Sequence, residues 1–465
     1  MMWMKWLFVA SVTSFLLSCS PARVKEQLNC EMPPTQEQSS KSNNLRVAIY
    51  IDGSGSMLGY VKDGETNYVK ALHAIRNVFE LTGKLPVEYY RNGNNSQRIT
   101  TSEYYSYAAR PIFYDGSNSK YKAVSSPIDA AIVAPRKNED KMTVIITDLE
   151  QNSGDVTKLN KKIQDTYFNA ERPDYAVGIW AVKSQFNGNV YIQNSDILKT
   201  FNYKSGNTPE KLRPFYILFL GPYRDIKYYF EQLKNYDSQE LLANSKLIIF
   251  HPDNLIESIS NLQTLPTNLP KGINRPYSLV KDGLYASKNN NVPIDLLQID
   301  NTTQNELVID YNVPFKQYKN SLLIDVNSIQ HKKNVQKFDK FLKKFTSNIE
   351  TSEINEAIKL TNWQILDQEN KLKFSAIIQP HKFTSPGVYQ FKFDIFTQNL
   401  QSPSWWQEWD WTSRTSDKDG SKTHNLEAFL IGLKNRTETM KVEQSDTRIN
   451  NYWLIGRFCY AIQKN

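Results

Sequence analysis

A carboxylate and two hydroxyls follow the first apolar stretch of the chain at alternate positions. Residues 45–51 are rich in β-branched side chains, and Asp52, Ser54 and Ser56 come directly after them. A loop that leaves the carboxyl end of a buried strand can present alternate side chains on one side, and the two intervening glycines allow a tight backbone. Hard oxygen donors of this kind suit Mg²⁺, which binds about six oxygens and keeps some of them as water. This segment therefore predicts a divalent-metal site.

The segment Asp52-Gly53-Ser54-Gly55-Ser56 resembles the start of the metal-ion-dependent adhesion site of von Willebrand factor type A domains, Asp-x-Ser-x-Ser. Two later segments resemble the other loops of that site. Ser126 precedes a proline where the family usually has Thr, and Asp148 matches the second carboxylate. The resemblance implies that Asp52, Ser54, Ser56, Ser126 and Asp148 hold one Mg²⁺, or Mn²⁺ or Ca²⁺ in its place. It also implies that the metal accepts a carboxylate from a partner protein.

Two positions depart from that family pattern. Leu149 stands where the family usually has Gly, which removes backbone freedom, and Glu150 adds a further carboxylate. Ser126 in place of Thr keeps the hydroxyl. Two interpretations stay open: a competent metal site that binds a partner protein, or a structural or assembly protein whose vestigial site uses these residues for caps and turns.

Enzyme motifs are missing from the sequence. Ser54 and Ser56 do not lie in Gly-x-Ser-x-Gly, no phosphate-binding Gly-x-x-x-x-Gly-Lys-Ser/Thr occurs, and the five histidines show no His-Glu-x-x-His or other paired ligand spacing. We therefore expect recognition rather than turnover, with no catalytic residues. A metal-dependent hydrolase is the least favoured alternative because no base is adjacent to the motif.

The elements that must position these loops alternate between short apolar strands and amphipathic helices. Strand patterns cover residues 45–51, 86–90, 142–147, 175–182, 215–220 and 246–250, and helical spacing covers 68–81, 127–133, 156–168 and 224–233. This order predicts an α/β fold, a doubly wound and mostly parallel sheet that is Rossmann-like, as in the resembled family, with helices on both faces. Ligands of such sheets bind at the carboxyl ends of the strands. We therefore expect residues 45–251 to form the domain that carries the metal site.

The pattern changes after about residue 269, where short strands with turn residues between them replace the helical spacing. We expect residues 270–465 to form a β-sandwich-like C-terminal domain with short helices. Residues 335–346 have the spacing of a basic amphipathic helix, with a solvated face expected and contact with anionic lipid as the alternative, and residues 426–433 have the spacing of another short helix. Four tryptophans, Trp405, Trp406, Trp409 and Trp411, are expected to pack in a core rather than form a sugar-stacking or membrane surface.

Residues 1–18 have the pattern of an export signal, with an apolar run too short to span a bilayer. The sequence Leu16-Leu17-Ser18-Cys19 resembles the lipobox of bacterial lipoproteins, which implies cleavage before Cys19 and a lipid on its thiol. An ordinary signal peptide or an N-terminal anchor helix is the alternative. Residues 19–44 are polar and predict a flexible tether. We therefore expect a lipid-anchored protein of the bacterial cell envelope that faces the periplasm or the exterior.

The composition argues against a disordered protein and against a nucleic-acid-binding protein. The chain has 465 residues, 12% of them aromatic, with a net charge of +8 and no long block of Lys or Arg, so we expect a folded protein without a nucleic-acid partner. The three cysteines are Cys19, Cys30 and Cys459. Because cysteine pairs tend to oxidise outside the cytosol, Cys30 and Cys459 are the expected disulfide once Cys19 carries lipid, with two free thiols as the alternative.

Overall fold

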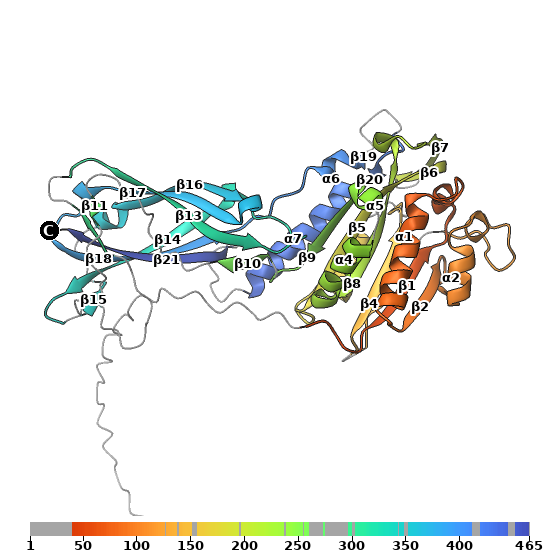
Figure 1. Cartoon of the computed structure of the whole chain (residues 1–465), viewed down its shortest axis with the longest axis horizontal. Helices are drawn as coiled ribbons and strands as arrows, with labels where there is room; N and C mark the ends of the chain where they lie inside the picture. Colours follow the sequence, from red (N-terminus) through yellow and green to blue (C-terminus); the bar gives the residue numbers. More distant parts are fainter. Residues whose placement is uncertain are drawn as a thin grey trace, which may run out of the picture.

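The computed structural model describes residues 40–125, 127–136, 139–150, 156–194, 197–236, 239–253, 255–259, 273–274, 296–299, 303–342, 344–347, 352–411, 419–444 and 452–464. The expected signal segment, Cys19, Cys30, most of the expected tether and Ser126 lie outside these residues. The described chain forms an α/β part and a β-rich part that lie end to end (Figure 1).

A seven-stranded sheet forms the centre of the α/β part in the described chain, with strand order β3-β2-β1-β4-β8-β5-β9. Its strands are β1 (Arg46–Asp52), β2 (Val87–Asn92), β3 (Gln97–Ile99), β4 (Lys141–Thr147), β5 (Tyr175–Ser184), β8 (Arg213–Pro222) and β9 (Ser245–Phe250). The helices beside it are η1 (Gly55–Tyr60), α1 (Asn67–Arg76), α2 (Thr101–Tyr107), α3 (Val156–Thr166), α4 (Tyr223–Tyr236) and α5 (Gln239–Ala243).

Alternate residues of β1 point into two different cores. Val47, Ile49 and Ile51 are buried in the same cluster as the apolar residues of α1 and α4, whereas Ala48 and Tyr50 are buried in the cluster that includes α3. Successive side chains of a strand point to opposite faces of its sheet. Helices therefore cover both faces, and the α/β class predicted from the sequence is confirmed.

The expectation of a mostly parallel sheet is wrong. In the described part of this sheet β1 pairs in parallel with β2 and with β4, but the pairs β2–β3, β4–β8, β8–β5 and β5–β9 are all antiparallel. The cause is a hairpin that the sequence pattern did not suggest, β6 (Asn187–Asn194) and β7 (Ile197–Lys204), which leads from β5 into β8. Two neighbouring strands that are connected without a crossover helix pair in antiparallel orientation. Strand β8 therefore lies between β4 and β5.

C-terminal residues complete the α/β part. They form α6 (Trp405–Glu408), β19 (Asp410–Trp411), β20 (Thr423–His424) and α7 (Leu426–Gln444). Helix α7 packs against α3, where Asn160 donates its side-chain amide to the Phe429 carbonyl (3.1 Å). It is far longer than the short helix expected at residues 426–433. Helix α7 follows the domain boundary expected between residues 251 and 270, yet it packs on the α/β part that precedes this boundary.

Three of the four tryptophans predicted to pack in a core are buried, whereas Trp411 of β19 is only partly buried against the core cluster that includes α1. Trp405, Trp406 and Trp409 are buried, and the ring of Trp406 lies against Phe250 at the end of β9. Burial of large aromatic side chains stabilises the docking of this C-terminal segment on the sheet.

The β-rich part contains two sheets among the described residues. One has the order β10-β13-β17-β16, and the other has the order β11-β12-β21-β18-β14-β15. Rings join them, because Phe458 contacts Tyr311 and Phe374 of the first sheet and stacks on Phe393 of its own. The strands are β10 (Ile256–Ile259), β11 (Ile273–Asn274), β12 (Leu296–Ile299), β13 (Leu307–Gln317), β14 (Gln330–Asp339), β15 (Lys344–Thr346), β16 (Ile358–Leu366), β17 (Lys371–Ile378), β18 (Gly387–Thr397) and β21 (Trp453–Lys464).

The helix predicted over residues 335–346 is wrong, because this segment is the β14–β15 hairpin. Val335 pairs with Phe391 of β18, and Phe338 pairs with Phe345 across the hairpin. These cross-strand contacts bury apolar area that an isolated amphipathic helix would leave exposed, so tertiary pairing overrides the helical spacing.

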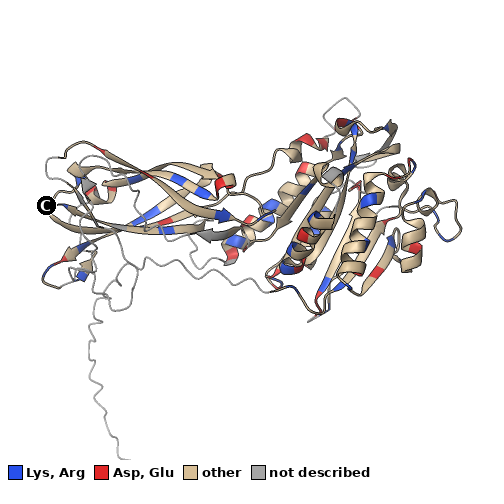
Figure 2. Cartoon of the chain, in the orientation of Figure 1, with Lys and Arg blue, Asp and Glu red and all other residues tan. Residues whose placement is uncertain are grey.

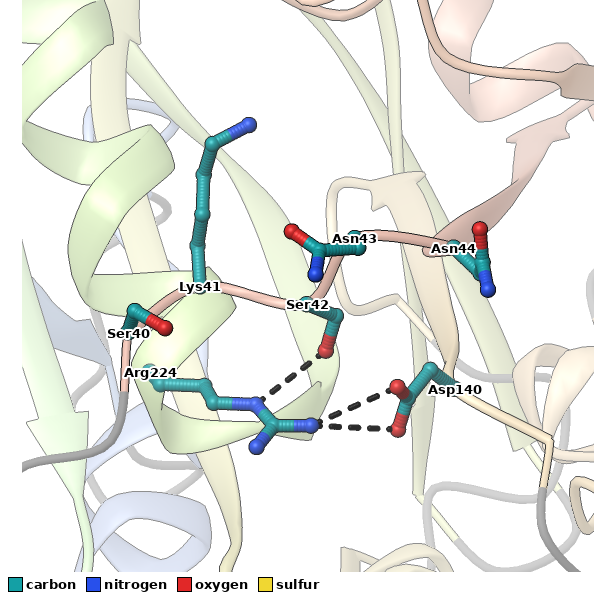
Figure 3. A pocket seen from close by; sticks show the side chains of 7 residues that line it. All are labelled: Ser40, Lys41, Ser42, Asn43, Asn44, Asp140 and Arg224. Carbon is teal, nitrogen blue, oxygen red and sulfur yellow. Dashed lines mark hydrogen bonds and ion pairs between the residues drawn. The ribbon is translucent and has the colours of Figure 1, made fainter.

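The first described residues are fixed to the N-terminus of α4 (Figure 3). Ser42 donates its backbone N–H and its hydroxyl to the buried Asp225 carboxylate, at 2.8 and 2.6 Å. Arg224 donates to the Ser42 hydroxyl (3.1 Å) and forms an ion pair with Asp140 (3.3 Å). The end of the expected tether is therefore held against the α/β part at Ser42.

Cys459 lies in β21 and is disulfide-bonded. Since Cys19 and Cys30 both fall outside the described residues, the pairing of Cys30 with Cys459 stays a prediction. Among the helices that the structure describes, no helix has the length and apolarity needed to cross a membrane.

Candidate metal site

Asp52 ends β1 and is buried at the carboxyl end of the strand. One oxygen of its carboxylate, Oδ1, accepts a hydrogen bond from the backbone N–H of Ser54 (2.9 Å). The other, Oδ2, accepts one from the hydroxyl of Thr147 at the end of β4 (3.0 Å). Because β1 and β4 are parallel neighbours, their carboxyl ends meet at one edge of the sheet.

The two serines of the motif lie beside this carboxylate. The hydroxyl oxygens of Ser54 and Ser56 are 3.0 Å apart, and both side chains are buried. Burial raises the pKa of the nearby Asp148 carboxyl, and a hydrogen bond from Ser56 opposes part of that rise. The structure therefore brings together four of the five residues that the sequence predicted: Asp52, Ser54, Ser56 and Asp148.

Ser126 is the fifth predicted residue and lies outside the described residues. The next residue, Pro127, is described, and its carbonyl accepts a hydrogen bond from the side chain of Asn92 (3.1 Å). Asn92 pairs with Asp52 in the register of β2 and β1. Pro127 therefore lies at the same edge of the sheet as Asp52.

The turn after β4 positions Asp148. Leu149 has a φ of 60°, so the backbone takes the left-handed conformation although the residue is not Gly. Glu150 donates its backbone N–H to Asp148 Oδ1 (3.2 Å). The other oxygen, Oδ2, is buried and accepts no hydrogen bond. A buried carboxylate oxygen without a donor is energetically costly unless a cation compensates it.

Arg213 is the feature of this site that sequence reasoning missed. Its fully buried guanidinium donates to Glu150 (3.1 Å) and lies 3.7 Å from Asp148 Oδ2. Burial raises the pKa of both carboxyls, and Arg213 opposes that rise. A single Arg before an apolar strand, 63 residues from Glu150, gives no sequence signal.

Arg91 supports the motif from the opposite side. Its guanidinium donates to the carbonyls of Gly53 (2.8 Å), Phe113 (3.0 Å) and Lys122 (3.0 Å). A Cβ atom at position 53 would lie 2.6 Å from Arg91 Nε, so Gly is required there by this close approach. The loop backbone is thus clamped in the conformation that presents Ser54 and Ser56.

Two segments lie over the site. The β6–β7 hairpin packs on η1, and a Cβ atom at Gly55 would be 3.7 Å from the Tyr191 hydroxyl. From the C-terminal segment, the carbonyls of Gly420 and Lys422 accept hydrogen bonds from Arg213, both at 3.1 Å. The loop that bears the motif is therefore enclosed on two sides.

The donor set fits a small hard cation. Asp52 and Asp148 supply carboxylate oxygens and Ser54 and Ser56 supply hydroxyls, which are ligand types that Mg²⁺ prefers. No three His, Cys, Asp or Glu side chains gather as a metal-ligand group in the part of the chain that the structure describes. A site here would therefore depend on its two serine hydroxyls and on water to complete the coordination.

Comparison of the chain with family models, curated proteins and solved structures finds no match.

Proposed function

We propose that the protein binds a divalent metal ion, Mg²⁺ in the first place, through Asp52, Ser54, Ser56 and Asp148, with Ser126 as a further ligand. When bound, the metal would supply an electrophilic position that accepts a carboxylate from a partner protein. The protein would then be a lipid-anchored adhesion module of the cell envelope, held through Cys19, with an α/β part of the von Willebrand factor type A kind and a sandwich-like C-terminal part. The proposal includes no catalytic step.

One observation carries this proposal. Asp148 Oδ2 is buried without a hydrogen-bond donor, on the side chain that Ser56 contacts and close enough to Asp52 for the two carboxyls to interact. Two buried carboxylates this close repel each other when both are ionised, and a cation between them removes that repulsion. The left-handed backbone at Leu149 supports the same conclusion, because strained residues concentrate at binding sites.

A structural role with a vestigial metal site is the second candidate, and Arg213 favours it. The guanidinium already compensates part of the charge of Asp148 and Glu150, and it holds the C-terminal segment through the Gly420 and Lys422 carbonyls. In this alternative the acidic cluster serves to fix that segment on the sheet.

A metal titration of stability separates the two candidates. Metal that binds only the folded chain at about 100 times its dissociation constant should add about 2.7 kcal/mol to the free energy of unfolding. We expect this gain in the full chain with Mg²⁺ and its loss in Asp52→Ala, because hydroxyls cannot replace the carboxylate charge. The measurement is thermal and urea unfolding across a Mg²⁺ and Mn²⁺ series, with chelator as the zero point.

Asp165→Ala is the matched control, since Asp165 is an exposed aspartate of α3. It should keep the full metal-dependent gain. Identical unfolding of the wild type and Asp52→Ala at every metal concentration would reject the metal site and leave the structural role. Partner binding that persists in chelator would reject metal-dependent recognition even where the metal binds.

A further inference from the structure

The β14–β15 hairpin exposes two consecutive large apolar side chains at its tip. Phe341 is 97% exposed and Leu342 is 59% exposed, and these are the highest exposures among the large apolar side chains that the structure describes. Single exposed apolar residues are common on folded proteins, but two adjacent ones at a protruding tip create an apolar surface that water solvates poorly.

Hydrogen bonds fix the backbone of the turn that carries these side chains. Asp339 Oδ1 accepts hydrogen bonds from the backbone N–H groups of Phe341 (2.8 Å) and Leu342 (3.0 Å). Below the tip, the rings of Phe338 and Phe345 meet edge to face at 5.3 Å. The hairpin therefore presents Phe341 and Leu342 on an ordered support.

Lysines lie on both sides of the apolar pair in the sequence, and Figure 2 shows Lys or Arg positions along the β14–β15 hairpin. Lys340 directly precedes Phe341, Lys343 and Lys344 follow Leu342, and Asp339 is the acidic residue before them. The Asp339 carboxylate is engaged with the turn backbone. An apolar tip flanked by exposed lysines matches a bilayer surface, where the apolar side chains enter the acyl boundary and the lysines meet anionic headgroups.

The position of the tip fits this partner. The hairpin lies at the end of the β-rich part, away from the seven-stranded sheet (Figure 1). Strand β15 is the edge strand of its sheet, so no strand pairs with its outer edge in the described chain. A second copy of this chain would bring the same lysines together and repel, whereas an anionic lipid surface neutralises them.

We propose that the β14–β15 tip, Lys340 to Leu342 with Lys344, is a membrane-contact site that inserts Phe341 and Leu342 into bilayers containing anionic phospholipid. This site does not depend on the metal site. It gives the molecule a contact with the membrane in addition to the lipid expected at Cys19, and it orients the β-rich part toward the bilayer.

Site-specific photo-crosslinking tests the proposal on the full chain. In Phe341→p-benzoylphenylalanine the photoreactive ring replaces a side chain that is almost fully exposed, so the fold should persist. The chain is mixed with vesicles of phosphatidylcholine containing or lacking phosphatidylglycerol, irradiated, and examined for lipid adducts by mass spectrometry. Tyr105→p-benzoylphenylalanine is the matched control, since Tyr105 is 58% exposed on α2 of the α/β part.

We expect lipid adducts at position 341 well above those at position 105, and more of them with phosphatidylglycerol. Each neutralised lysine near an anionic surface should weaken contact about fivefold. Lys340→Gln with Lys344→Gln should therefore weaken the contact, and reduce the adducts at position 341, by about 25-fold. Adducts at position 341 no more abundant than at position 105, or adducts formed with a second copy or another protein in place of lipid, would overturn the proposal.

Discussion

Leu149 adopts an unfavourable left-handed backbone conformation next to Asp148 of the candidate metal site. Its φ of 60° suits Gly, yet its side chain is buried in the core cluster that also contains Ile128, Ile145 and Leu159. Left-handed backbone costs a residue with a Cβ atom roughly 1–2 kcal/mol. Burial of a Leu side chain contributes about 1.5–3 kcal/mol, which offsets that cost. The turn that positions Asp148 can therefore form although position 149 is not a glycine.

Truncation at this position tests the strain directly. Leu149→Gly and Leu149→Ala delete the same buried side chain, but only Gly avoids the left-handed penalty. We expect the Gly variant to be more stable than the Ala variant by about 0.5–1 kcal/mol, measured by urea unfolding. Leu72, buried in α1, is the control, because there Ala should be more stable than Gly by about 1 kcal/mol. The same Ala preference at both positions would contradict strain at Leu149.

At the scale of elements, the contact between α3 and α7 decides where the C-terminal segment lies. Gly432 of α7 faces Asn160 of α3, and a Cβ atom at position 432 would lie 2.8 Å from Asn160 Cγ. The missing side chain at Gly432 lets the helices approach closely enough for Asn160 to bond to the Phe429 carbonyl. This close packing places α7 beside α3, and the two helices share one core cluster with the sheet.

Adding one methyl group at this contact should therefore destabilise the protein. Gly432→Ala improves helix propensity by about 1 kcal/mol, but overpacking of a close contact typically costs about 1–3 kcal/mol. We expect a net loss of stability that becomes smaller in the Asn160→Ala background, where the opposing side chain is gone. A double-mutant cycle by urea unfolding measures this coupling. Additive effects of the two substitutions would show that the helices do not meet at this contact.

At the scale of the whole molecule, the two parts join at the end of β9. The backbone N–H of Ile249 donates to the Asn320 carbonyl (2.7 Å), and Lys234 of α4 donates to the Asn320 side chain (3.0 Å). His251 follows β9 and is buried against the ring of Tyr223. Lys441 of α7 pairs with Asp253 close by (3.2 Å). This junction therefore ties the sheet, α4, α7 and the β-rich part together.

The buried His251 predicts acid sensitivity of this junction. Burial lowers its pKa to about 4 in the folded state, against about 6.5 in the unfolded chain. The unfolded state therefore binds more protons between these values, so the contribution of His251 to stability is full above about pH 6.5 and is lost as the pH falls toward 4. We expect the stability difference between the wild type and His251→Gln to shrink by up to about 3 kcal/mol over this range. Urea unfolding at a series of pH values measures it, and a constant difference would contradict a buried neutral histidine.

Local patterns in the sequence determined the elements and the motif. The β-branched run of β1, the apolar strand β4 and the helical spacing of α1, α3 and α4 are properties of neighbouring residues, so they could be predicted without knowing what packs against them. The carboxyl ends of β1 and β4 carry Asp52 and Asp148, and parallel neighbours bring such ends together. The gathering of Asp52, Ser54, Ser56 and Asp148 at one edge of the sheet was therefore predicted from the sequence.

Contacts between residues far apart in the chain decided the rest. The placement of β8 between β4 and β5, the pairing of residues 335–339 as a strand and the docking of α7 on α3 depend on area buried against distant partners, which no local pattern encodes. Arg213 enters the site for the same reason, since its charge is compensated only once β8 lies beside β4. Tertiary structure thus placed the Arg213 charge in the site and the β6–β7 hairpin and the C-terminal segment over it. Burial and Coulomb energy depend on distances in space rather than on separation along the sequence.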